Sequence, residues 1–136
     1  MILVYAVVKF LAYSAWCHVG LRSVQSSAAG VASSLRLGAA RWLIGLFFGI
    51  VVFFAVGSID AAAAARTYFL VYSPIRAVEW GIMAFLLAGR NPQTSPSIPW
   101  VRLSVWCVGG MLVSFLTDLL SPEGLQGRFC VGRCLC

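Results

Sequence analysis

Apolar residues dominate four stretches of the chain, and polar residues gather between them. The four stretches cover residues 1–19, 42–59, 67–88 and 100–120. Each has about 20 residues, which is the length that a helix needs to cross the hydrocarbon core of a bilayer. The pattern therefore predicts an all-α protein: a polytopic membrane bundle, a single domain over residues 1–120, with four transmembrane helices.

The first apolar stretch differs from a cleaved signal peptide. A signal peptide places positive charges ahead of its apolar region, whereas this stretch has Lys9 in its apolar middle and no basic residue before it. We therefore expect it to be retained as a helix.

The segment between the first two stretches, residues 21–41, is richer in Ser, Ala and Arg. Val24, Ala28, Val31 and Leu35 recur with the spacing of one helical face. This spacing is compatible with an interfacial helix that lies along the membrane surface after the first span. The alternative is a Ser/Ala-rich connection that continues the flanking helices, and the sequence leaves both open.

The other connections have a different composition. Residues 89–99 contain Pro92, Pro96 and Pro99 among Asn, Gln, Ser and Thr, which predicts a non-helical connection. Aromatic residues near the predicted span ends are typical of anchors at the membrane interface. These residues are Trp42, Tyr68 and Trp100.

The tail, residues 121–136, contains three of the five cysteines. Cys130, Cys134 and Cys136 do not have the spacing of paired CxxC motifs, and a metal site would need a fourth ligand from elsewhere. We predict no metal there. The alternatives are a disulfide or, if the tail is cytoplasmic, acylation.

Three glycines mark one side of the second stretch. Gly45 and Gly49 form a GxxxG pair, and Gly57 follows two turns later on nearly the same side. Small residues let a second helix approach closely. Packing within the chain is the default interpretation, and oligomerisation is the alternative.

Composition and charge support a membrane location. The chain is 61% hydrophobic and 10% charged, with a formal net charge of +6. Membrane proteins collect Arg and Lys in cytoplasmic loops, and no basic stripe with interleaved aromatics points to nucleic acid. The preference for Arg over Lys fits GC-rich coding, so we expect a bacterial inner membrane.

The positive residues also predict an orientation. The loops after the first and third stretches carry five arginines, against three on the opposite side. The five are Arg22, Arg36, Arg41, Arg90 and Arg102, and the three are Arg66, Arg128 and Arg133. By the positive-inside rule, both termini then face outward.

Three ionisable residues lie inside the predicted spans: Lys9, Arg76 and Glu79. Such residues are costly in a bilayer and mark candidate functional sites. Arg76 and Glu79 are three residues apart on one helix face, so they can neutralise each other as a structural pair. If Lys9 competes for Glu79, an uncompensated cation remains that suits an anionic ligand or a partner's carboxylate. Lys9 can also extend its ammonium to the interface.

Two aspartates lie at predicted span ends. Asp60 and Asp118 are expected at the membrane edge, where they can pair with Arg66 and Lys9. A membrane edge is an ordinary place for a carboxylate.

The single histidine, His18, lies at the end of the first span. One histidine cannot supply both axial ligands of a heme, so we predict no cofactor. A heme shared through His18 with a partner subunit is the alternative.

No nucleophile motif, phosphate loop or carboxylate dyad is present, and we predict that the protein is not an enzyme. We expect an integral membrane protein that acts through helix contacts, as an accessory, assembly or anchoring subunit of a larger membrane complex. Its partners would be the bilayer and other membrane subunits or a second copy. The alternative is a small oligomeric transporter or channel that uses Arg76 and Glu79.

Overall fold

The computed structural model describes residues 2–25, 30–56, 64–88 and 100–121 of the chain. This part is helical and contains no strand. Its helices are α1 (Ile2–Gln25), α2 (Val31–Val56), α3 (Ala64–Ala88) and α4 (Trp100–Leu119). The predicted all-α bundle is thus confirmed.

All four helices are long and apolar enough to cross a membrane. Their candidate spans are Leu3–Ser23, Val31–Ala55, Arg66–Ala88 and Trp100–Leu119. α3 includes Pro74, and its helical assignment is unbroken across this residue. The described part of the chain therefore has the form of a multi-pass membrane protein.

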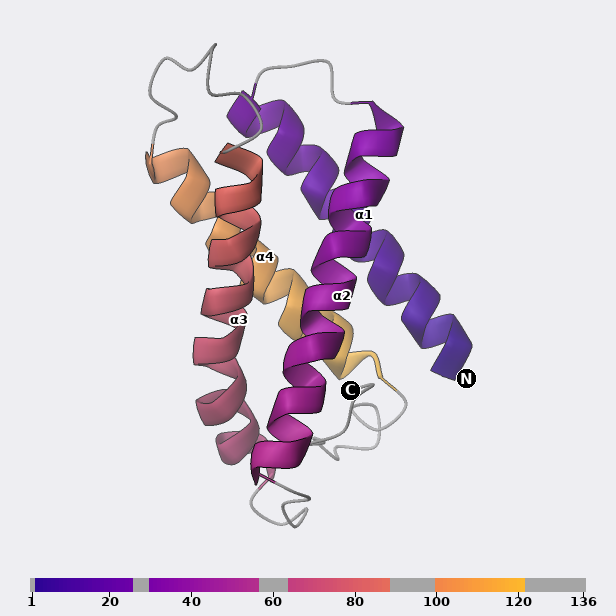
Figure 1. Ribbon diagram of the computed structural model, residues 1–136, viewed down its shortest axis with the longest axis vertical. Coiled ribbons are helices and arrows are strands. Elements are labelled where there is room, and N and C mark those ends of the chain that lie inside the picture. Colours follow the sequence, from indigo (N-terminus) through magenta and orange to yellow (C-terminus); the bar gives the residue numbers. More distant parts are fainter. Residues whose placement is uncertain (1, 26–29, 57–63, 89–99, 122–136) are drawn as a thin grey trace.

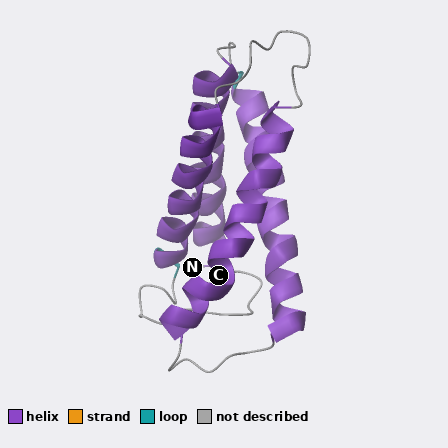
Figure 2. Ribbon diagram, turned by 90° about the vertical axis from the view of Figure 1, so that its left-hand side faces the viewer, coloured by secondary structure: helices purple, strands orange, loops and turns teal. Residues whose placement is uncertain are grey.

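The helices pack in a ring in which each mainly contacts two others. α1 packs against α2 and α4, and α3 packs against α4 and α2. Figure 1 shows α2 and α3 nearly upright, with α1 and α4 crossing behind them at a tilt. The side view in Figure 2 shows that the bundle is long and narrow. Because α1 is tilted, it diverges from α2 toward its N-terminal end.

Of the two alternatives that the sequence left open for the segment 21–41, the structure fits the one in which the flanking helices continue into it, and not the interfacial helix. α1 continues to Gln25, and α2 already begins at Val31. The second helix therefore starts eleven residues before residue 42, and most of the segment belongs to two bundle helices. The polar residues near the start of α2 are accommodated by contact with α1, since His18 Nδ1 lies 2.8 Å from Ser34 Oγ.

The larger apolar cluster contains residues of all four helices, and within it two tryptophans join α1 to α4. Trp16 Nε1 donates to the carbonyl of Trp106 at 3.0 Å, and Trp106 Nε1 donates to the carbonyl of Trp16 at 3.1 Å. A Cβ on Gly20 would overlap the Trp106 ring, and one on Gly109 would overlap the Trp16 ring. The two glycines thus make room for a reciprocal pair of indole hydrogen bonds between the helices.

A matched pair of glycine substitutions tests the packing of α1 on α2. A Cβ on Gly38 would overlap Ser14 of α1, whereas a Cβ on Gly81 would meet nothing within 4 Å. Gly38→Ala is therefore expected to lower the free energy of unfolding by about 1–3 kcal/mol, the usual cost of overpacking. Unfolding of the detergent-solubilised protein measures the change. Gly81→Ala should be neutral or slightly stabilising, and equal losses in the two variants would contradict the close crossing of α1 and α2.

Candidate functional site: a buried charge cluster

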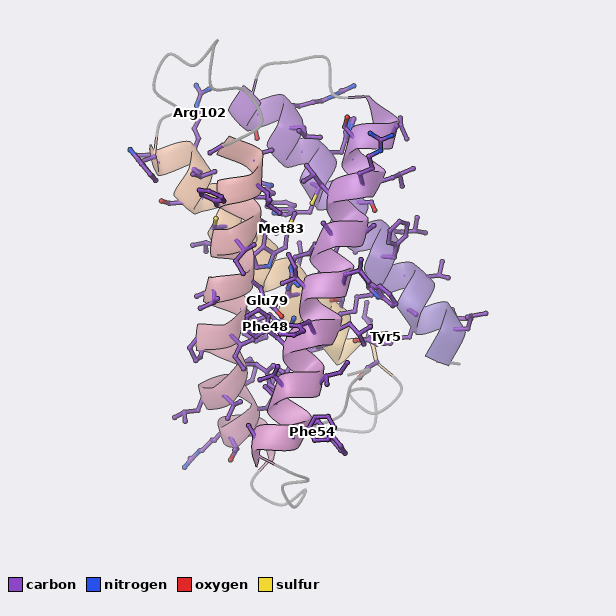
Figure 3. All side chains as sticks on the ribbon, viewed as in Figure 1. Tyr5, Phe48, Phe54, Glu79, Met83 and Arg102 are labelled. Carbon is purple, nitrogen blue, oxygen red and sulfur yellow. The ribbon has the colours of Figure 1, made fainter. Side chains whose placement is uncertain are left out.

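Five charged side chains meet in the interior of the bundle, and every helix contributes at least one. We call them the charge cluster: Lys9 of α1, Arg41 of α2, Arg76 and Glu79 of α3, and Asp118 of α4. All are at most 9% exposed. Figure 3 shows Glu79 in the interior, between α3 and α2, whereas Phe54 and Arg102 lie at opposite ends of the bundle.

The cluster alternates basic and acidic groups. Asp118 accepts from Lys9 Nζ at 2.5 Å and from Arg76 Nη2 at 2.8 Å. Glu79 Oε2 accepts from Arg76 Nη1 at 2.8 Å and from Arg41 Nη2 at 2.6 Å. Arg76 therefore joins the two acids, and each acid is held by two cations.

Two tyrosine hydroxyls complete the shell of Asp118. Tyr5 donates to Oδ1 at 3.1 Å and accepts from Lys9 Nζ at 2.9 Å. Tyr68 donates to Oδ2 at 2.5 Å. A carboxylate with four donors around it is well compensated for the loss of water.

Arg41 has a different environment on the far side of Glu79. Its Nη2 also donates to Ser114 Oγ at 3.2 Å, and the same oxygen accepts from Trp80 Nε1 at 3.1 Å. The Arg41 guanidinium carbon lies 4.7 Å from the Tyr13 ring centroid and 5.1 Å from that of Trp80. Aromatic faces at these distances stabilise a cation.

The structure selects among the charge pairings considered from the sequence. Arg76 pairs with Glu79 and Lys9 pairs with Asp118, as the sequence allowed, so Lys9 does not compete for Glu79. Glu79 is bound by the two arginines instead. Asp118 lies near the end of α4, as expected, but its side chain is buried inside the bundle. Asp60, its counterpart in that expectation, lies outside the described residues.

Arg41 is the cluster member that the sequence did not reveal. Its position just before the uncharged apolar run favours a place in the loop ahead of the second span. The structure puts it within α2, fully buried at 0% exposure. Without Arg41, the loops after the first and third stretches carry four arginines and the opposite side carries three. The charge difference therefore gives weaker support to an orientation with both termini outside. Trp42 likewise moves from the predicted span end to near the middle of the candidate span Val31–Ala55.

The structure describes two of the three glycines of the second stretch, Gly45 and Gly49. A Cβ on Gly45 would lie 3.0 Å from Arg41 Nη1, 3.7 Å from Arg76 Nη1 and 3.8 Å from Glu79 Oε1. Gly45 thus lies against the chain's own charge cluster, as packing within the chain requires. Gly49 is buried, and Gly57 lies outside the described residues.

The other candidate ligands are not brought together by the described structure. His18 is hydrogen-bonded to Ser34 of α2. Cys130, Cys134 and Cys136 lie outside the described residues. Within the helices that the structure describes, no group of three His, Cys, Asp or Glu side chains is placed to hold a metal ion.

Comparisons with protein family models, curated proteins and solved structures find no match to this chain. The fold and the charge cluster therefore define the class by themselves: a four-helix protein of the multi-pass membrane type, with an ion network in its interior.

The cluster predicts that losing an acid costs more than losing a cation. Glu79→Gln leaves the buried Arg41 guanidinium group without a counter-charge and Arg76 with Asp118 alone, and it should cost about 3–5 kcal/mol of unfolding free energy. Arg41→Gln leaves Glu79 paired with Arg76 and should cost about 1–3 kcal/mol. Unfolding of both variants in the same detergent measures the difference. An Arg41→Gln loss as large as that of Glu79→Gln would contradict this account of the charge balance.

Proposed function

We propose that the protein is a non-catalytic subunit that works through helix contacts within a larger membrane complex, in an accessory, assembly or anchoring role. The observation that supports this proposal most directly is an apolar groove between α1 and α2. A bacterial inner membrane, which the composition suggests, is part of the same proposal.

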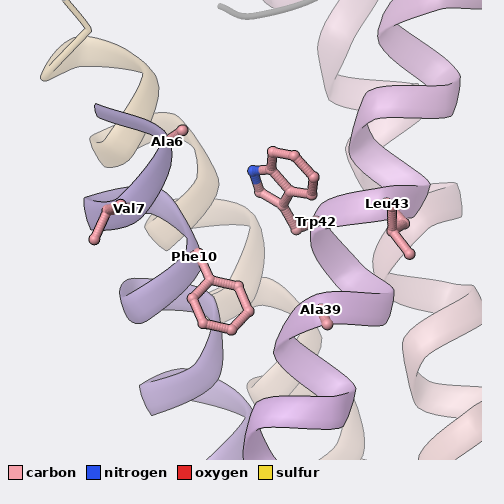
Figure 4. Close-up of a pocket in the computed structure, with 6 residues that line it drawn as sticks. All are labelled: Ala6, Val7, Phe10, Ala39, Trp42 and Leu43. Carbon is pink, nitrogen blue, oxygen red and sulfur yellow. The ribbon is translucent and has the colours of Figure 1, made fainter. Parts of the chain in front are cut away.

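The groove has a volume of about 410 Å³ and lies where α1 diverges from α2. Its lining residues are apolar or aromatic: Ala6, Val7, Phe10, Ala39, Trp42 and Leu43. Figure 4 shows the rings of Phe10 and Trp42 facing the space between the two helices. The two alanines on opposite sides let another helix approach closely, as small residues do in membrane helix pairs.

Trp42 distinguishes a protein occupant from a lipid. Its indole N–H has no hydrogen-bond acceptor among the residues that the structure describes. Trp42 is half-buried and lies near the middle of its span, where acyl chains offer no acceptor. An indole N–H that is removed from water usually finds one. A transmembrane helix of another subunit that carries a hydroxyl or amide side chain fits the groove in both shape and polarity.

The charge cluster limits how such a partner can bind. The sequence left room for a partner to supply charges to the third span, but α1, α2 and α4 supply them. Large apolar side chains face outward instead, among them Phe47, Phe54 and Phe85. We therefore propose that partner contacts are apolar, with isolated hydrogen bonds such as that of Trp42.

Site-specific photocrosslinking tests this function. A photoreactive residue at Leu43, in the groove, should give one discrete adduct in native membranes, with the crosslinked peptide in a transmembrane segment of another protein. Trp42→Phe keeps the aromatic ring and removes the donor, so it should weaken co-purification of that protein severalfold. The matched substitution Trp100→Phe, at a side chain 78% exposed at the start of α4, should have no effect.

The same experiment separates the competing interpretations. The identified protein must co-elute in fixed stoichiometry and capture the chain reciprocally. Crosslinks to lipid alone, or equal yields from Leu43 and from the exposed Leu112 of α4, would contradict the subunit function. A homogeneous oligomer of this chain with Arg76-dependent ion flux in liposomes would instead favour the transporter or channel, which stays a prediction of the sequence.

A further inference from the structure

The charge cluster contains more positive than negative side chains. Three cations, Lys9, Arg41 and Arg76, meet two acids, Glu79 and Asp118, which leaves a formal excess of +1 among these five groups. An unbalanced charge in a low-dielectric interior is costly unless a counter-charge is bound.

The unsatisfied atoms of the cluster can all donate a hydrogen bond. Four buried atoms have no partner in the described part of the chain: Arg41 Nε, Arg41 Nη1, Arg76 Nε and the Tyr13 hydroxyl. No buried carboxylate, carboxamide or other pure acceptor is among them. These four atoms therefore lack a hydrogen-bond acceptor. The excess positive charge of the cluster favours a negatively charged acceptor.

These donors belong to neighbouring groups. Arg41 and Arg76 donate to the same oxygen, Glu79 Oε2. The Arg41 guanidinium carbon lies 4.7 Å from the Tyr13 ring centroid. Gly45 places no side chain beside the two guanidinium groups. A Cβ at this position would lie closer to Arg41 Nη1 than to Arg76 Nη1. Glu79 Oε1 lies near Gly45 as well, and it would repel an anion on that side.

We propose that this chain binds one small monovalent anion, of chloride size, at Arg41 on the side of Tyr13. Arg41 supplies charge and N–H donors, and the Tyr13 hydroxyl supplies a further donor. The aromatic faces of Tyr13 and Trp80 stabilise the guanidinium but do not neutralise it. Arg41 is 0% and Tyr13 1% exposed, so the enclosed position selects a small ion over a lipid headgroup. The subunit function proposed above does not depend on this site.

Thermal unfolding of the purified protein in chloride and in gluconate tests the site. At equal ionic strength the two salts screen charges equally, so only specific binding of the anion raises the midpoint temperature of unfolding. We expect a saturable rise with chloride, bromide and formate and none with gluconate, which is too large. Tyr13→Phe should raise the half-saturating chloride concentration about tenfold, because it removes one donor, and Arg41→Gln should abolish the chloride effect.

Tyr5→Phe is the matched control. It is the same substitution at a hydroxyl in the same cluster, but that hydroxyl is already bonded to Asp118. It should lower stability without changing the chloride dependence. Crystals soaked in bromide should show an anomalous peak in contact with Arg41.

Three results would overturn the anion site. They are equal unfolding midpoints in chloride and gluconate, an equal change of the half-saturating chloride concentration in Tyr5→Phe and Tyr13→Phe, or an anomalous bromide peak that does not contact Arg41. If Arg41→Gln fails to fold, the chloride dependence of Tyr13→Phe compared with that of Tyr5→Phe still tests the anion site. Failure of the crosslinking experiment would leave the anion site intact, so the two proposals can fail independently.

Discussion

The structure depends on one interaction: Arg76 bridges two buried carboxylates. One guanidinium group binds Asp118 of α4 through Nη2 and Glu79 of its own helix through Nη1. Through these acids it is linked to Lys9 of α1 and Arg41 of α2. Hydrocarbon solvates charge poorly, so each helix must turn its charged residue toward this centre. A planar guanidinium can satisfy two carboxylates at once, which a lysine ammonium does with less geometric control.

Placing the charges inside has consequences for the rest of the bundle. Most large side chains on the outer surface are apolar, and the helices are held elsewhere by small, specific contacts such as the reciprocal Trp16 and Trp106 bonds. Membrane helices lack the hydrophobic driving force that packs soluble bundles, so close approach at glycines and isolated hydrogen bonds carry more of the association. The divergence of α1 from α2 is the place where this packing leaves a groove.

The two proposals use different residues of the same two helices. Phe10 and Trp42 face the groove, whereas their neighbours Lys9 and Arg41 are buried in the charge cluster. Charge is thus separated from the surface that meets lipid or a partner. Specificity for a partner then depends on shape and on single donors, and recognition of an anion depends on the cationic excess of the interior.

Length and apolarity along the chain were sufficient to predict four membrane helices, because hydrocarbon demands about 20 apolar residues with internally bonded backbone whatever their neighbours are. The pairing of Arg76 with Glu79 was also predictable, since it follows from their spacing on one helix. The burial of Arg41 and Asp118 was not, because a charge near the end of an apolar run looks the same whether it faces water or another helix. Only the crossing of α2, α3 and α4 decided that, by bringing groups of opposite sign from distant parts of the chain within hydrogen-bond distance.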